Sequence, residues 1–314
     1  MDAKITKQRL SNLLSYDWLK ILVVIAAAVG VLALLFTMTA TRPTNAQTFS
    51  VYSYTDVQMG RDKGTLNDTL KEKNVFSYDI LEINSESFFS NDYASQAFSA
   101  RRAAGEGTVI FTSSVDGEGK ASNMSGLYSL TIDNIYSGEA ISRGCYNPQY
   151  FLETEIKEYL VEYFGQDLQG DLNKEAARIR FMDRNGRDKR FRSQESKERG
   201  VQQEEQRLEK LREDYLAMKT AFEEGKLFYT AVNAETAETT TYRWGESCPE
   251  GFYPAAVNVS ALPKIIDLFY CIDAEGKATN ETLQMVIFRN QSDAAYDLNY
   301  ETASFLSYLV EKYA

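Results

Sequence analysis

The sequence predicts an α/β protein: a single N-terminal transmembrane helix followed by a mixed α/β extracytoplasmic domain with a charged helical insertion. Three observations support this class. Residues 21–41 carry no charged side chain, residues 48–112 alternate between strand-like and helix-like segments, and residues 171–215 hold 24 charged side chains in 45. The chain of 314 residues is long enough to bury a substantial core.

The apolar run near the N-terminus is long enough to cross a bilayer. A helix rises 1.5 Å per residue, so about 20 residues span the roughly 30 Å hydrocarbon core. Basic residues lie on its N-terminal side, at Lys4, Lys7, Arg9 and Lys20. By the positive-inside rule we therefore expect residues 1–18 in the cytoplasm, residues 19–40 in the lipid bilayer of the cell membrane, and the rest outside.

Two alternatives stay open for this segment. One is a cleaved signal peptide, whose apolar part is usually about 7–15 residues and so shorter than this run. The other is a buried core helix. Residues 41–47 are polar and contain Pro43, so we expect a short linker there, before a domain of residues 48–314.

The first part of that domain predicts three strands with two helices between them. The strands are rich in β-branched and aromatic residues and cover Thr48–Tyr54, Phe76–Ile83 and Thr108–Thr112. The helices are Leu66–Lys73 and Tyr93–Ala104. Because β-α-β crossovers are right-handed, the three strands should be parallel neighbours.

Residues 105–111 read Gly-Glu-Gly-Thr-Val-Ile-Phe, a glycine turn that leads into an apolar strand. Together with the strand-like run Tyr253–Ser260, this pattern resembles the type 2 periplasmic-binding-protein fold. The resemblance covers about a third of the chain, and it implies a solute-binding-like module with a ligand cleft between two lobes. No ligand residue of that family is matched, so none is carried over.

A charged, helix-forming insertion of about residues 151–225 separates the two strand-bearing parts. Residues 151–164 predict an amphipathic helix. Further on, six apolar residues fall at heptad spacing: Val201, Leu208, Leu211, Tyr215, Met218 and Phe222. This seam packs either on its own domain or on a partner protein, which would be contacted through residues 171–225.

Basic residues cluster within the insertion. The candidate partner contacts are Arg184, Arg187, Lys189, Arg190 and Arg192. Such a cluster would attract an acidic protein or anionic lipid headgroups. The alternative is a solvated loop between two helices, in which exposed charges contribute little to stability.

The last third of the chain returns to strands and ends in a helix. The expected strands are Lys226–Val232, Thr239–Trp244, Ala255–Val259, Ile265–Ile272 and Leu283–Arg289. The expected C-terminal helix has one apolar face, which is formed by Phe305, Leu306, Leu309, Val310 and Tyr313.

The composition excludes several kinds of chemistry. The chain has no histidine, so it lacks a Ser-His-Asp triad, a Cys-His pair and a His-liganded zinc site. Its net charge of −11 divides into +3 over residues 1–46 and −14 over the rest, which argues against nucleic-acid binding. We expect no metal and no cofactor, since residues 114–121 depart from a phosphate-binding loop at both ends.

Three cysteines outside the membrane allow one disulfide. Cys145 and Cys248 lie in turn-like sequence, so we favour a bridge between them. A Cys248–Cys271 bridge and no bridge are the alternatives, since Cys271 stands in an apolar strand where a free cysteine is an ordinary core residue. The favoured bridge would contribute up to about 4–5 kcal/mol in the chain-entropy model.

We therefore expect a membrane-anchored extracytoplasmic binding module, solute-binding-like and non-catalytic, whose partners are the bilayer and a small solute or a protein. The alternative is a scaffold or assembly subunit of a cell-envelope complex, which contacts another protein through residues 171–225. A hydrolase with paired carboxylates ranks third, and its candidate acids are Glu82, Glu86, Glu106 and Asp116.

Overall fold

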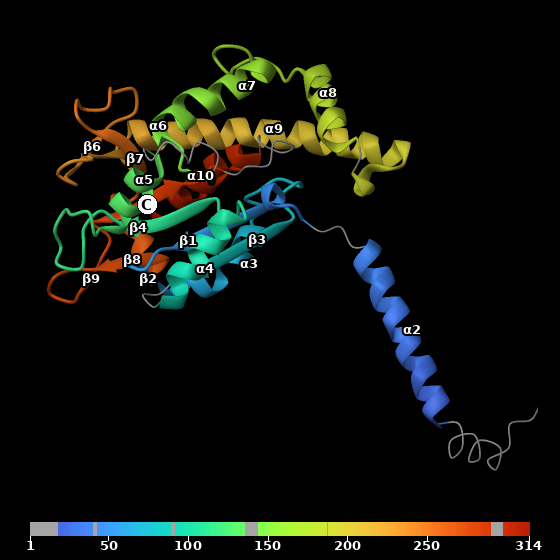
Figure 1. The fold of residues 1–314 in the computed structure, drawn as a ribbon. Coiled ribbons are helices and arrows are strands. Elements are labelled where there is room, and N and C mark those ends of the chain that lie inside the picture. The colour runs from blue at the N-terminus through green and yellow to red at the C-terminus, as the bar shows by residue number, and fades with distance from the viewer. Residues whose placement is uncertain (1–17, 40–42, 89–91, 136–143, 187, 290–297) are drawn as a thin grey trace, which may run out of the picture. The chain divides into compact units, whose positions relative to one another are not determined.

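The computed structural model describes residues 18–39, 43–88, 92–135, 144–186, 188–289 and 298–314 (Figure 1). The chain divides into two compact units, Met1–Arg42 and Pro43–Ala314. The expected cytoplasmic segment up to residue 17, residues 40–42 and Arg187 lie outside the described residues.

The first unit contains the helix α2, Trp18–Thr39. Its 22 residues are long and apolar enough to cross a membrane, because a helix of this length spans about 33 Å. No other helix among the described residues meets the same criteria of length and apolar composition.

The second unit is built on a seven-stranded mixed sheet. Its strands are β1 (Thr48–Ser53), β3 (Glu82–Ser87), β4 (Val109–Ser113), β5 (Phe228–Val232), β6 (Thr239–Tyr242), β7 (Tyr253–Asn258) and β10 (Leu283–Ile287). They are ordered β3-β1-β4-β10-β7-β5-β6. Strands from both halves of the chain thus join in one sheet, and residues 43–314 form one compact unit.

The predicted β-α-β-α-β unit is confirmed. Strand β1 pairs in parallel with β3 on one side and with β4 on the other. The two connecting helices are α3 (Leu66–Glu72) and α4 (Asp92–Ala103). The two connections run in opposite directions across the sheet, so right-handed crossovers place these helices on opposite faces. Accordingly, Leu70 of α3 and Phe98 of α4 pack into different apolar clusters.

Two expected strands differ from the structure. The strand expected at Phe76–Ile83 begins only at Glu82, because Tyr78 and Asp79 leave the extended path for the ion network described below. The strand expected at Ile265–Ile272 begins with a 3₁₀ turn. Its second half is β8 (Phe269–Ile272), in a small sheet ordered β2-β8-β9 that also contains β2 (Gln58–Met59) and β9 (Ala278–Thr279).

Helices cover both faces of the main sheet. They are α5 (Gly126–Ile135), α6 (Pro148–Tyr150), α7 (Ile156–Phe164), α8 (Lys174–Asn185), α9 (Gln194–Glu223) and α10 (Thr302–Tyr313), with a π turn at Phe151–Glu155 and 3₁₀ turns at Asn45–Gln47, Arg61–Thr65 and Lys189–Phe191. The 30-residue α9 crosses the molecule, with α7 and α8 on its outer side (Figure 1).

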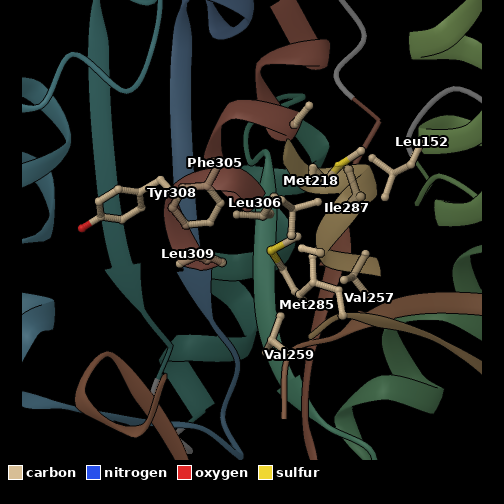
Figure 2. Close-up of a cluster of buried hydrophobic side chains, with 14 of the residues drawn as sticks. Leu152, Met218, Val257, Val259, Met285, Ile287, Phe305, Leu306, Tyr308 and Leu309 are labelled. Atoms are coloured by element: carbon tan, nitrogen blue, oxygen red, sulfur yellow. The ribbon is translucent and has the colours of Figure 1, made fainter. Parts of the chain in front are cut away.

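The apolar seam of α9 packs on its own domain. Leu208, Leu211, Tyr215, Met218 and Phe222 are all buried in the main core cluster. The same cluster receives Leu306 of α10 and Met285 of β10, which lie close together in Figure 2. Truncation of a fully buried leucine of this kind to alanine costs about 2–5 kcal/mol. These five residues of the seam are therefore occupied, whereas the sixth, Val201, is half-buried and lines a hollow between α8 and α9.

Candidate functional site

A groove of about 490 Å³, the first groove, lies between residues 70–83 and α9. Its described lining residues are both apolar and polar: Leu70, Phe76, Ile80, Ile83, Lys71, Asn74, Ser77, Tyr78, Gln203, Gln206, Arg207 and Lys210. None of the described residues that line it is acidic. This volume and this mixture of apolar and polar groups are typical of ligand sites.

One wall of the first groove is shaped by the end of α3. The N–H of Val75 donates to the carbonyl of Leu70 at 3.0 Å, and the N–H of Asn74 donates to the carbonyl of Lys71 at 3.0 Å. These two bonds form a Schellman motif, with Asn74 in the left-handed conformation at φ 49°. Asparagine tolerates that conformation better than most residues, so the local sequence turns the chain back toward α9.

The other wall is a polar stripe of α9. Gln203, Gln206, Arg207 and Lys210 stand at i, i+3, i+4 and i+7, so they lie on one side of the helix. The sequence analysis attended to the apolar seam of this helix and missed this stripe. The i, i+3, i+4, i+7 spacing of these four polar residues could have indicated the stripe. The same spacing is also typical of an ordinary solvent-exposed helix face.

The floor of the first groove rests on a buried ion network that joins three carboxylates to three guanidinium groups: Asp79, Glu204, Glu301, Arg184, Arg190 and Arg207. Arg207 donates from Nε to Glu301 at 3.1 Å and from Nη1 to Glu204 at 3.0 Å. Arg184 Nη2 lies 2.7 Å from Glu204 and 3.1 Å from Asp79. Arg190 also pairs with Asp79.

Tyr78 connects this network to the groove. Its hydroxyl donates to Glu204 Oε2 at 2.9 Å and accepts a hydrogen bond from Arg184 at 3.1 Å. Burial and the nearby Glu204 raise the pKa of Tyr78 far above its ordinary value, so the hydroxyl keeps its proton. Burial also raises the pKa of Glu301, and Arg207 opposes that shift. The groove therefore has a floor whose side chains are held in place by reciprocal bonds.

The structure corrects the expectation of a solvated basic cluster at two positions. Arg184 is buried and Arg190 is mostly buried, since both are paired with Asp79. Lys189 and Arg192 are exposed, so a partner contact through these two residues stays a prediction. Arg187 lies outside the described residues. Sequence reasoning missed Asp79 because it stands more than 100 residues away from the basic side chains that it neutralises.

The structure does not form the favoured disulfide. All three cysteines are free, and Cys145 and Cys248 pack against apolar clusters on opposite faces of the main sheet. Burial raises the pKa of the Cys145 thiol to about 12. A thiol with that pKa is protonated at neutral pH and reacts slowly. Cys271 is buried, as expected for a small core residue.

Three of the four candidate acids of a hydrolase have structural partners, and the fourth, Glu82, lines a hollow of about 220 Å³ together with Glu106 and Arg101. Glu86 and Glu106 both bind Arg101, at 3.1 Å and 2.7 Å. Asp116 accepts hydrogen bonds from the N–H groups of Glu118 and Lys120, so it closes the turn that the sequence placed at residues 114–121. These contacts give each of the three acids a structural partner.

A second groove of about 320 Å³ adjoins the first at Lys210. Its lining residues come from the end of α3, from α9 and from α10: Lys73, Val75, Lys210, Asp214, Ser304, Ser307, Tyr308 and Glu311. Lys210 pairs with Asp214, and Lys73 lies 3.1 Å from Glu311. The second groove is therefore close to neutral. Of the three basic residues in the described lining of the first groove, Arg207 pairs with Glu204 and Glu301, and Lys210 pairs with Asp214.

Asp56 occupies a different place, at the carboxyl ends of the parallel strands β1 and β4. Its carboxylate accepts from the N–H of Ser113 at 3.0 Å, from the N–H of Gly126 at 3.1 Å and from the hydroxyl of Thr112. Burial raises its pKa to about 6. A Cβ at Gly126 would lie 2.3 Å from this carboxylate, so only glycine fits there. Asp56 thus joins the end of β4 to the start of α5.

Comparison with known proteins identifies no relative. No protein-family model matches the chain, no curated protein matches it, and no solved structure matches it.

Proposed function

We propose that this chain is a membrane-anchored, non-catalytic binding module. Its α/β unit lies outside the membrane and takes a ligand in the first groove. The single observation that supports binding is the composition of this groove. Basic, amide and apolar side chains line it together, with no acidic residue in the described lining, although residues 47–314 carry a net charge of −14.

The anchor is supported by the length and composition of α2. None of the residues of its apolar window, Trp18–Leu35, is buried. The basic side chains Lys4, Lys7 and Arg9 precede it, which favours a cytoplasmic N-terminus. The competing interpretation is a signal sequence, which would be removed from the mature protein.

The test is thermal unfolding of the full chain in detergent micelles with a panel of small carboxylates, phosphate esters, neutral solutes and mixed peptide pools. A ligand at ten times its Kd should raise the Tm by about 3–5 °C. Gln206→Trp places an indole at the groove rim and should abolish the shift. Gln202→Trp, on the side of α9 that faces α8, is the matched control and should preserve it. If every ligand that raises the Tm of the wild type also raises the Tm of Gln206→Trp, the proposal is wrong.

The second candidate function is a scaffold that binds a protein through the insertion. A hollow of about 450 Å³ between α8 and α9 favours it, because Met182 of α8 lines the hollow and is exposed, and Ile179 on the same helix is also exposed. Deletion of residues 171–225 is not a suitable test, since it would remove core residues such as Leu208. Ile179→Lys with Met182→Lys should release a co-purifying partner. Retention of that partner would contradict the scaffold.

A further inference from the structure

We propose that two copies of this chain associate through α8, with Ile179 of each copy seated in the hollow between α8 and α9 of the other. This inference rests on the second candidate function, because it names the protein that binds at this hollow, and it is independent of the ligand in the first groove. It is argued from an exposed apolar side chain, the hollow beside it and the charges around both.

Ile179 is an apolar group that would gain from a partner. It is 55% exposed, and Met182, three residues further along the same side of α8, is 38% exposed. Removal of apolar surface from water contributes about 25 cal/mol per Å². Burial of these two neighbouring side chains against another surface would therefore favour association.

The hollow between α8 and α9 offers such a surface. Its volume is about 450 Å³, and Met182 and Val201 line it together with polar side chains of both helices. Val201 is half-buried, so part of its side chain is open to an incoming group. The flexible side chain of Met182 can adapt to the shape of an isoleucine.

The side chain and the hollow lie next to each other. Met182 lines the hollow, and it is about one helical turn away from Ile179. A two-fold axis between two copies can therefore fill both hollows at once, and such a contact closes at a dimer. Figure 1 shows α8 and the start of α9 at one end of the main sheet.

The side of α8 that carries Ile179 is acidic. Glu175 and Asp183 stand four residues before and four residues after Ile179, so they flank it on the helix surface. Both are exposed, and neither forms an ion pair with another described residue. Ile179 would therefore enter a hollow together with two uncompensated negative charges.

The hollow carries two uncompensated cations. Arg178 and Lys197 line it, and neither has an ion-pair partner in the part of the chain that the structure describes. Its acids are Glu198 and Glu205, and Glu205 pairs with Lys174 at 3.3 Å. Counting Lys174, three basic and two acidic side chains give the hollow a net charge of +1.

These charges favour a second copy over a partner of one sign. The flanks of Ile179 carry −2 and the hollow carries +1, so a strongly acidic or strongly basic protein would be repelled by one of the two surfaces. A second copy related by a two-fold axis brings the acidic flanks of each chain to the cations of the other.

The contact is small, because α8 has 12 residues and is about 18 Å long. We therefore expect a Kd in about the micromolar range. Two anchored copies in one bilayer would meet at a higher effective concentration than copies in solution.

The experiment measures association of the full chain in detergent micelles, by Förster transfer between copies that carry a donor or an acceptor at the C-terminus. One variant reverses the acids, Glu175→Lys with Asp183→Lys. The other reverses the cations, Arg178→Glu with Lys197→Glu. Each variant alone places like charges in both contacts, so its Kd should rise about tenfold or more.

An equimolar mixture of the two variants is the decisive sample. It pairs opposite charges in both contacts, so its Kd should return to within about threefold of the wild-type value. Ile179→Asn should also raise the Kd about tenfold. Ile272→Asn is the matched control, since Ile272 of β8 is 48% exposed, and it should leave the Kd unchanged.

Wild type that stays monomeric at about 100 µM overturns the proposal, as does a mixture that associates no better than either charge variant alone. An equal effect of Ile179→Asn and Ile272→Asn also overturns it. If wild type is monomeric but Ile179→Lys with Met182→Lys releases a co-purifying partner, the second copy is wrong and the scaffold stands. If no partner is released either, the second candidate function is wrong as well.

Discussion

Arg184 Nη2 lies 2.7 Å from Glu204 Oε2, and the two side chains are only 4% and 0% exposed. Arg184 comes from α8 and Glu204 from α9, and Asp79 of the loop before β3 binds the same guanidinium. One buried arginine therefore ties the helical insertion to the β-α-β unit. A charge removed from water in this way is stable only while its partners remain.

Loss of that arginine should be costly. Arg184→Met leaves Asp79 and Glu204 buried with fewer cations, and we expect the free energy of unfolding to fall by about 3–5 kcal/mol. Arg192→Glu, at an exposed position of the same basic stretch, should change it by about 0.5 kcal/mol or less. Urea denaturation of both variants measures this. Equal, small effects would show that the network contributes nothing to stability.

Gly200 of α9 lies where α8, α9 and the turn between them approach closely. A larger residue at this position should therefore lower the stability of the protein. A Cβ at this position would lie 2.2 Å from the ring of Phe181 and 2.9 Å from that of Phe191. Gly200→Ala should therefore destabilise by about 1–3 kcal/mol, although alanine is the better helix former. Gly64→Ala, where nothing lies within 4 Å, is the control. A more stable Gly200→Ala protein would contradict this packing.

Asp56 should give stability a pH dependence. Its folded pKa of about 6 lies above the ordinary value of 3.8, so its favourable contribution is complete below pH about 4 and is lost as pH rises through 6. A shift of this size corresponds to about 3 kcal/mol. Between pH 4 and pH 7, wild type should lose about that much free energy of unfolding relative to Asp56→Asn. Urea denaturation measures this free energy at each pH. If it varies in parallel for the wild type and Asp56→Asn, the raised pKa of Asp56 is refuted.

The membrane topology is tested on intact cells. With α2 as an uncleaved anchor, added protease should digest a C-terminal tag and spare an N-terminal tag. The charge bias on the N-terminal side of α2 is the reason for this expectation. Protection of the C-terminal tag would show the opposite orientation. A mature protein that starts near Gln47 would show that the apolar segment is a cleaved signal peptide.

Local patterns predicted much of the fold. The apolar strand before Ser113 and the heptad spacing that ends at Phe222 correspond to β4 and to the buried seam of α9. Both features depend on periodicity within one segment, which a sequence displays directly. The small sheet of β2, β8 and β9 was missed, because its two outer strands have only two residues each.

The site could not be predicted in the same way. Alternation at Phe76, Tyr78 and Ile80 favoured a strand, but Tyr78 and Asp79 turn toward α8 and α9. The partners of Asp79 lie more than 100 residues further along, and no local pattern reveals such a pairing. The first groove could not be predicted for the same reason, because residues 70–83 and α9 form its two walls only after tertiary packing.

Hydrogen exchange tests most directly whether the ligand lies in the first groove. The full chain in micelles is compared with and without a ligand that raises its Tm, by mass spectrometry of peptic fragments. Binding along α9 should slow amide exchange in residues 71–83 and leave the turn at residues 114–122 unchanged. Unchanged exchange in residues 71–83 at a ligand concentration that raises the Tm would contradict the proposed function, because the ligand would then lie elsewhere.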